Sequence, residues 1–413
     1  MATSGQKRVA AGGMVAHPSL IHDHHRSDAT AGTSTVILIG PSVRAAAEMV
    51  RTFARQTRSI VGVDAFGDVD TRRFCNQWFE IDTFKLGDAG LRPSRQPDAA
   101  KSRYEIHVVG GLNAASSSQD PVIRQAITCL ERDTPAIDEL GYWSNGTRIA
   151  TPPTFAAPPT NQHRTPLRKS LLRKSLRSSG GLGVRMWHPS DPTDSELVVL
   201  QRRIFGRSIS VAAYAHANHS VVLLGCCRSF KRGGSVTPFA YAGNAGPYPI
   251  PHNIRDCVQT VADRFASDRR FRGPFNFDFV VDRDDRWWLH EINPRYSASF
   301  EIYERLNRRS ILIDGPPIAS IPHTGKPAVI KRIIYAEQPS TFRYETIADR
   351  YQATNLFDDR YDVRIADYPS DGTRIPAHHP TCTIIAIDRD AIVMQRGDEG
   401  DFKTTQRNTV NDP

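Results

Sequence analysis

Residues 273–295 alternate apolar and polar side chains on both sides of a short charged turn. Before the turn, three phenylalanines alternate with Asn276 and Asp278. The phenylalanines therefore share one face of an extended strand, and the two polar residues share the other. After the turn, Glu291 and Asn293 again share one face. This pattern predicts two strands joined by a turn, each with one apolar face and one polar face.

Asp278, Glu291 and Asn293 would bring two carboxylates and one amide oxygen to a small region if the two polar faces coincide. Hard oxygen ligands of this kind suit Mg²⁺, and Mg²⁺ held by few protein oxygens usually shares its coordination shell with phosphates. The alternative is an ordinary amphipathic hairpin with a hydrated polar face. That alternative explains the two acids but explains Asn293-Pro-Arg295 poorly. The hairpin therefore favours a metal site and nucleotide chemistry.

A glycine-rich stretch, Ser178-Ser-Gly-Gly-Leu-Gly183, follows a strand predicted over residues 171–174. Backbone N–H groups of glycines can approach a phosphate closely, and Lys174 at the end of the strand would neutralise its charge. The spacing is not that of a Walker A loop, because no Lys-Ser or Lys-Thr pair follows the last glycine. A flexible turn is the commoner meaning of glycines alone. With Lys174 and its basic neighbours, a polyphosphate site is an equal candidate.

Ordered structure is predicted to begin with residues 35–63. A strand over 35–39, a helix with an apolar stripe and a second strand over 59–63 form a Rossmann-type unit with parallel strands. Only Gly40 of the G-x-G-x-x-G fingerprint is present, which argues against a dinucleotide site and against an oxidoreductase. Arg44, at the start of the helix, is by default a surface arginine; the alternative is a contact to an anionic substrate.

Composition limits the environment and the partners of the chain. No run of about 18 apolar residues is present, so no membrane span is expected. The six cysteines are scattered without a CxxC pair, which favours a reducing, cytoplasmic environment. The net charge of +9 includes a basic cluster between Arg164 and Arg185. That cluster has no aromatic residue before Trp187 with which to stack single-stranded bases, so a nucleic-acid partner is disfavoured.

The order of these features resembles the ATP-grasp superfamily of carboxylate–amine ligases, in a poorly characterised branch. A Rossmann-like unit comes first, then Lys174 with the glycine-rich stretch, then a strand that reaches Gln201, and finally the Asp…Glu-x-Asn-Pro-Arg hairpin. The most specific parts are Asp278-Phe-Val, Leu289-His-Glu-Ile-Asn-Pro-Arg295 and Tyr296-Ser-Ala-Ser-Phe-Glu301.

The resemblance implies a fold of the α/β and α+β classes. It is an ATP-grasp fold with an N-terminal Rossmann-like pre-ATP-grasp domain and a small β-rich C-terminal part. The expected boundaries are a disordered leader over 1–34, the Rossmann-like domain over 35–150, a linker over 151–167, the ATP-grasp lobes over 168–315, the β-rich part over 316–396 and a frayed tail over 397–413.

The resemblance also implies the roles of individual residues toward ATP and Mg²⁺, with Mn²⁺ as the alternative ion. The metal ligands would be Asp278, Glu291 and Asn293. The phosphates would be held by Lys174 and covered by a lid that contains Ser179, Gly180, Gly181 and Gly183. Gln201 would lie beside the adenine. The catalytic residues would be Lys174 and Arg295, and Arg295 would stabilise the transferred phosphoryl group.

The activity implied is an ADP-forming ligation. An acyl phosphate forms from a small-molecule carboxylate, and a small-molecule amine then displaces the phosphate to give a carbon–nitrogen bond. Two features depart from the family pattern. Arg202 stands where an acidic residue is usual, and the upstream lysine of many members is not evident. A catalytically silent ATP-binding sensor or scaffold protein is therefore the alternative.

Overall fold

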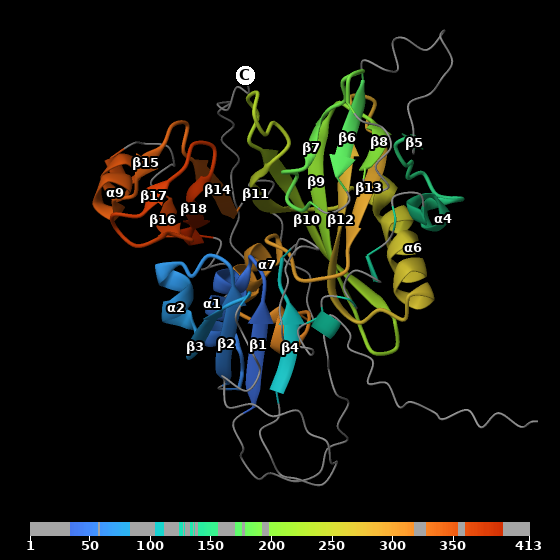
Figure 1. Ribbon diagram of the computed structural model, residues 1–413. Helices are drawn as coiled ribbons and strands as arrows, with labels where there is room; N and C mark the ends of the chain where they lie inside the picture. The colour runs from blue at the N-terminus through green and yellow to red at the C-terminus, as the bar shows by residue number, and fades with distance from the viewer. Residues whose placement is uncertain are drawn as a thin grey trace, which may run out of the picture.

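The computed structural model describes most of the middle of the chain and part of its N-terminal third (Figure 1). The described residues are 34–56, 58–82, 104–110, 139–155, 170–175, 178–191, 198–317, 328–353 and 360–390, with a few single positions between 124 and 136. The predicted C-terminal tail and all but the last residue of the predicted leader lie outside these residues.

The N-terminal part is a parallel sheet. Among the described residues its strand order is β3-β2-β1-β4, and α1 makes the crossover between β1 and β2. The elements are β1 (Thr35–Ile39), α1 (Val43–Phe53), β2 (Ser59–Asp64), α2 (Val69–Phe74), β3 (Gln77–Glu80) and β4 (Tyr104–Val108). The predicted Rossmann-type unit is confirmed. The strand order reverses between β1 and β4, and in sheets of this kind ligands bind at the carboxyl ends of the strands at such a point.

The second body is a long antiparallel sheet, which in the described part of the chain has the order β13-β12-β9-β10-β11-β14-β18-β16. Figure 1 shows α6 lying along one face of it, beside β12 and β13. The elements are β9 (Arg207–Ala215), β10 (Val221–Lys231), β11 (Tyr241–Tyr248), α6 (His252–Asp268), β12 (Gly273–Val281), β13 (Trp287–Asn293), β14 (Val329–Tyr335), β16 (Tyr361–Ala366) and β18 (Pro380–Asp388).

The predicted hairpin is β12 and β13, and its two faces are divided as expected. Phe275, Phe277 and Phe279 are fully buried and pack in one core with Val258 and Phe265 of α6. Burial of each phenylalanine contributes about 1.5–3 kcal/mol. The apolar face is thereby fixed against α6, which leaves the polar face of the hairpin toward the other side of the sheet.

A smaller sheet lies across from the long one. Its described strands are β5 (Thr154–Phe155), β8 (Val198–Arg202), β6 (Leu171–Ser175) and β7 (Val184–Met186), in that order. β5 falls within the segment expected to be a linker, and it pairs with β8. Three short helices complete the middle of the chain: α4 (Leu140–Ser144), α7 (Phe300–Asn307) and α8 (Ile311–Asp314).

The C-terminal part is rich in strands, as predicted, but its main strands extend the long sheet. β14 pairs with β11 and β18, and β18 pairs with β16. A two-stranded ribbon, β15 (Ser340–Thr341) with β17 (Arg374–Ile375), and helix α9 (Tyr344–Ala353) lie beyond it. β14 satisfies backbone groups that would otherwise form an exposed edge at β11.

The structure places Arg44 differently from the prediction of a surface arginine. Its side chain is 3% exposed, so the default assignment to the surface is wrong. It pairs with Glu48 at 2.9 Å, with Glu301 of α7 at 2.6 Å and with Asp367 after β16 at 2.7 Å. Arg305 adds a second guanidinium at 2.6 Å from Glu301. This ion network joins the N-terminal sheet to α7 and to the C-terminal part.

No helix in the described part of the chain is long and apolar enough to cross a bilayer.

Candidate functional site

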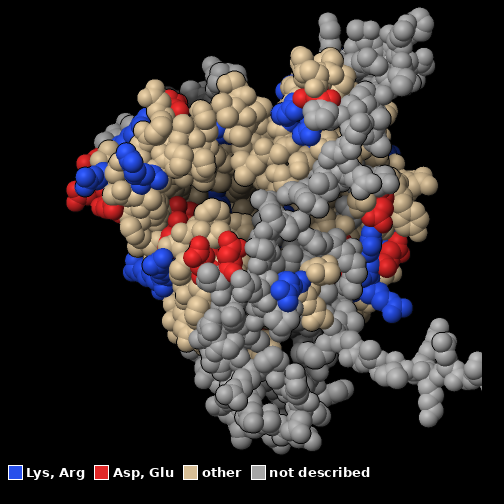
Figure 2. Space-filling view, viewed as in Figure 1, with Lys and Arg blue, Asp and Glu red and all other residues tan. Residues whose placement is uncertain are grey.

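One cleft runs between the three sheets and has a volume of about 1770 Å³. Figure 2 shows a hollow near the centre of one face of the molecule, bordered mainly by uncharged side chains. Pockets for a single small ligand usually measure about 300–1,000 Å³. The cleft is therefore large enough for a nucleotide together with a second substrate.

The polar face of the β12–β13 hairpin forms one wall of the cleft. Asp278 lies directly opposite Glu291, and Asn276 lies opposite Asn293. Asn293 Nδ2 donates to Asp278 Oδ2 at 3.0 Å, and Arg295 Nη2 donates to Asn293 Oδ1 at 2.7 Å. The structure thus brings together the three predicted metal ligands and the predicted phosphoryl-stabilising arginine.

Burial and the facing carboxylate of Glu291 raise the pKa of Asp278. Two carboxylates on adjacent strands repel one another, and a nearby cation relieves that repulsion. The donor set of two carboxylates and one amide oxygen suits Mg²⁺, which takes one or two protein carboxylates and completes its shell with water and phosphate. In the part of the chain that the structure describes, no group of three or more His, Cys, Asp and Glu side chains forms a fuller cage. The residues present therefore fit an ion shared with a nucleotide.

A β-bulge adds a further side chain to this wall. Asp278 pairs with Glu291 and Phe279 pairs with Leu289, so His290 has no partner residue in the ladder. As a result, consecutive residues His290 and Glu291 both line the cleft. Bulges often redirect side chains in this way beside functional sites.

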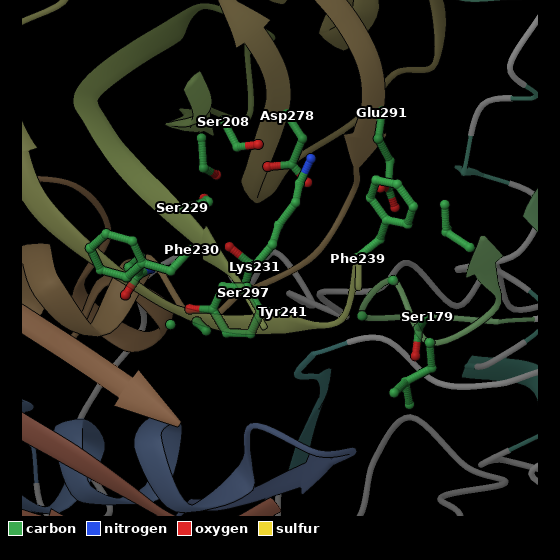
Figure 3. Close-up of a pocket in the computed structure, with 18 of the residues that line it drawn as sticks. Ser179, Ser208, Ser229, Phe230, Lys231, Phe239, Tyr241, Asp278, Glu291 and Ser297 are labelled. Carbon is green, nitrogen blue, oxygen red and sulfur yellow. The ribbon is translucent and has the colours of Figure 1, made fainter. Parts of the chain in front are cut away.

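Two lysines face the carboxylates. Lys174 is the penultimate residue of β6, and burial lowers the pKa of Lys174, while the charges of Glu291 and Asp278 oppose that shift. Lys231 ends β10, and in Figure 3 its side chain extends toward Asp278. Burial also lowers the pKa of Lys231, with the neighbouring charges of Lys174 and Arg203 acting in the same direction. Cations gathered in this way would be neutralised by a polyphosphate.

Lys231 was missed by sequence reasoning. The sequence pattern predicts a strand over 220–225, whereas β10 continues to Lys231. The signal lies in Cys226-Cys-Arg-Ser-Phe-Lys231, which continues as an extended strand. On a continued strand Lys231 falls on the same face as Ser229, and both residues line the cleft.

The glycine-rich stretch is the turn between β6 and β7, and it lies over the cleft. The Gly180 carbonyl accepts a hydrogen bond from the Tyr241 N–H at 2.8 Å, which connects this turn to the start of β11. Gly181 has φ of +74°, and a side chain there would overlap the Phe239 carbonyl oxygen. A Cβ added at Gly183 would lie 2.4 Å from the Cβ of Ser178. Ser179, Gly180 and Gly181 line the cleft, whereas Gly183, the fourth residue predicted for the lid, is not among its lining residues.

Gln201 and Arg202 lie at the opposite end of the small sheet. Gln201 is 2% exposed, and its Nε2 donates to Thr154 Oγ1 at 3.2 Å, so its amide group is engaged by β5. Arg202 is exposed and borders the cleft. Arg203 stacks on the Phe205 ring at 4.3 Å in the connection to β9.

Comparisons with known proteins agree with this geometry. Residues 147–299 match the family model for the ATP-grasp domain. No curated protein matches the sequence of the chain. N5-carboxyaminoimidazole ribonucleotide synthetase of Thermotoga maritima shares the fold with 10% sequence identity and a TM-score of 0.54, over 88% of this chain and 97% of that one. An L-amino acid ligase of Bacillus licheniformis shares it with 10% identity and a TM-score of 0.56, over 89% of this chain and 97% of that one. The biotin carboxylase–beta-gamma-ATP complex of Campylobacter jejuni shares it with 13% identity and a TM-score of 0.51, over 87% of this chain and 89% of that one.

Residues 147–299 therefore match the ATP-grasp domain, and most of the chain shares its fold with these ligase and carboxylase structures.

Proposed function

We propose that this protein is an ATP- and Mg²⁺-dependent ligase that joins a small-molecule carboxylate to a small-molecule amine and releases ADP and phosphate. The observation that carries the proposal is one cleft in which Asp278 and Glu291 face Lys174 and Lys231 beneath a glycine turn. This combination suits a metal–polyphosphate complex. The size of the cleft leaves room for the second substrate.

The metal would be held by Asp278, Glu291 and Asn293, with Mn²⁺ as the alternative ion. When bound, it would neutralise phosphate charge and act as a Lewis acid. Asn293 Oδ1 already accepts one hydrogen bond from Arg295, and an amide oxygen has a second lone pair for another partner. Arg295 is thereby fixed beside the ligand set.

The reaction has two displacement steps. An oxygen of the substrate carboxylate attacks the γ-phosphorus of ATP, so the bond to the bridging oxygen breaks and ADP leaves. The amine nitrogen then attacks the acyl carbon, inorganic phosphate leaves with the bonding electrons, and the nitrogen loses a proton. The protein would act mainly by positioning and charge stabilisation, as in other phosphoryl transfers.

Each named side chain has one task in this scheme. Lys174 and Lys231 would neutralise the negative charge of the phosphate oxygens, and Arg295 would stabilise the phosphoryl group during its transfer. The turn with Ser179, Gly180, Gly181 and Gly183 would cover the phosphates and exclude water, which would otherwise hydrolyse the acyl phosphate. Gln201 would act through the position of β8 rather than through its engaged amide.

Structural relatives support this class of reaction at the level of the fold. One is a Staphylococcus aureus N5-carboxyaminoimidazole synthetase complexed with ADP, and another is an L-amino acid ligase. We also propose a cytoplasmic location, which suits the free thiols of the five described cysteines.

The test is Mg²⁺-dependent ADP release with a panel of carboxylic acids and hydroxylamine, which traps an acyl phosphate as a hydroxamate without knowledge of the natural amine. Asp278→Asn and Glu291→Gln should each abolish acid-dependent ADP release. Full turnover in both variants would remove these residues from the metal site. Binding of Mg²⁺–ADP without turnover of any acid would instead favour the silent sensor or scaffold.

A further inference from the structure

The floor of the cleft carries polar side chains that the proposed reaction does not use. Ser229 of β10 pairs with Asn244 of β11, and Asn244 pairs with Lys331 of β14. All three residues line the cleft. Side chains of directly paired residues share a face of the sheet, so these form one row across three strands.

Tyr241 joins this row because of a second β-bulge. Phe230 pairs with Gly243 and Lys231 pairs with Tyr241, so Ala242 is the extra residue. In a regular strand, residues three apart point to opposite faces. The bulge restores both Tyr241 and Asn244 to the cleft side. In Figure 3, Tyr241 lies near Lys231 and Ser297.

Two groups in this row have no hydrogen-bond partner. Asn244 is 1% exposed, and its Oδ1 finds no partner among the described residues; the same is true of the buried Tyr241 hydroxyl. A buried polar group without a partner is costly, and most such groups in folded proteins are satisfied. Two unsatisfied groups that line one cleft are therefore arranged for a ligand.

The row is polar and carries no unpaired charge. Lys331 Nζ donates to the Ala298 carbonyl at 3.2 Å and pairs with the buried carboxylate of Glu301, so its charge is matched. Burial raises the pKa of Tyr241 well above its usual value, with nearby carboxylates including Asp278 acting in the same direction. The phenol is thus neutral. Lys231, the cation beside Tyr241, extends toward Asp278, so a charged ligand group at Asn244 would lose its hydration without an opposite charge of its own.

We propose that Asn244 and Tyr241, together with Ser229, form a subsite for a neutral hydrogen-bonding group, a carboxamide or a hydroxyl, on the non-reacting end of the acid substrate. The proposal rests on the proposed function and names the substrate class for the same cleft. The Tyr241 N–H is bonded to the turn over the phosphates, so this subsite adjoins the place where the acid must meet the γ-phosphate. An acid held there would reach from the reacting phosphate to the unpaired amide.

The subsite predicts strong selection against apolar analogues. A site built to hydrogen-bond a substrate group can reject an analogue that lacks it by roughly 10⁴–10⁵, because the site's own polar groups are then left unpaired. Asparagine, aspartate and leucine form one isosteric set, and threonine with valine forms a second. Each set varies the group at the subsite from neutral polar to charged or apolar at constant shape.

The first experiment compares thermal unfolding of the full chain with that of Asn244→Leu. Leucine keeps the volume and removes the unpaired amide, so the variant should unfold roughly 2–4 °C higher, with an unchanged shift on addition of Mg²⁺–ADP. Asn307 is the matched control, because its Nδ2 donates to the Tyr303 carbonyl at 2.7 Å. Asn307→Leu should unfold lower. A lower midpoint for Asn244→Leu would mean that its amide serves the fold, which would overturn the proposal.

The second experiment measures hydroxamate formation from the two isosteric sets. Asparagine should exceed aspartate and leucine, and threonine should exceed valine, by at least about tenfold in kcat/KM, and Asn244→Leu should erase the difference. Preference for the charged or apolar member, or a preference that survives the substitution, would overturn the subsite. If neither set reacts, the unfolding comparison decides alone. A wild-type chain that fails to bind Mg²⁺–ADP would refute the proposed function and leave the unfolding result to be judged by itself.

Discussion

Lys174 near the end of β6 and Lys231 at the end of β10 lie in different sheets, yet the charge of Asp278 acts on both lysines. Hydrogen bonds from charged donors contribute about 1.5–3 kcal/mol, which corresponds to roughly 10–100-fold in affinity. We therefore expect Lys174→Ala and Lys231→Ala each to weaken Mg²⁺–ADP binding by about that factor in titration calorimetry.

The matched control is Arg283, in the turn between β12 and β13. Its side chain is 94% exposed, so Arg283→Ala removes a cation of the same sign outside the cleft. It should leave the affinity for Mg²⁺–ADP unchanged. Equal losses in all three variants would indicate a general effect of net charge rather than contact with the phosphates.

Arg44 carries the second residue-level prediction, which concerns stability. Glu301 is fully buried and is shared by Arg44, Arg305 and Lys331. Removal of one partner of a buried ion pair leaves uncompensated charge and costs about 3–5 kcal/mol. Arg44→Ala should lower the free energy of unfolding by that amount in urea titrations. Arg364→Ala, which breaks a half-exposed pair with Asp362, should cost less than about 1 kcal/mol; similar losses in both would contradict this account.

At the scale of elements, the sequence predicts strands whose two faces differ in polarity. It does not predict features that depend on which strand pairs with which. The β12–β13 hairpin was predictable because its alternation is strict, and Arg295 follows it directly. The bulges at His290 and Ala242 were not predictable. A bulge is defined by which residues pair across a ladder, and the neighbouring strand is remote in sequence.

The same reasoning explains the errors over Arg44 and the C-terminal strands. Arg44 stands in a helix whose sequence gives no sign of its buried acidic partners, which lie 257 and 323 residues away. The strands after residue 316 were seen as strands, but their pairing with β11 depends on backbone groups exposed at its edge. Local pattern therefore predicts the elements and the residues that we propose as metal ligands, whereas long-range pairing determines the ion network and the floor of the cleft.

The turn between β6 and β7 supplies the element-level prediction. Gly181→Ala would drive a methyl group into the Phe239 carbonyl and so separate the turn from β11. Gly180 is the matched control, since its φ of +62° is similar and nothing lies within 4 Å of an added Cβ. Both variants carry the left-handed cost of about 1–2 kcal/mol, but only Gly181→Ala adds overlap. We expect Gly181→Ala to bind Mg²⁺–ADP at least about tenfold more weakly than Gly180→Ala, and equal affinities would show that this contact does not cover the phosphates.

At the scale of the whole molecule, the C-terminal part returns to the first domain. The Val69 N–H of α2 donates to the Tyr368 carbonyl at 3.0 Å, and the Asp367 N–H donates to Asp70 Oδ2 at 2.9 Å. Figure 1 shows α2 beneath the red C-terminal strands. This contact closes one end of the assembly, and it gathers the carboxylates of Asp68, Asp70 and Asp367 in a small volume.

This cluster of three carboxylates makes the free energy of unfolding dependent on pH near neutrality. Burial, together with the charge of Asp367, raises the pKa of Asp68 to about 7 and that of Asp70 to about 6. Both values lie above the ordinary 3.8, so the folded state binds these protons more tightly than the unfolded state. Their contribution is fully present below pH 3.8 and is lost as the pH rises through about 6 to about 7, with a slope of at most about 1.4 kcal/mol per pH unit for each group.

Asp68→Asn isolates this effect, because asparagine is neutral at every pH and keeps the shape of the protonated acid. In urea titrations from pH 5 to pH 8, the wild-type chain should lose stability relative to the variant as the pH rises, and most of the divergence should fall below pH 7. Buried pairs such as Glu301 with Arg44 hold the pKa of Glu301 well below its usual value, so they change stability only at much lower pH and cancel in the comparison. Parallel curves for the two proteins over this range would show that the contact between α2 and the C-terminal part tolerates the charge of Asp68 without cost.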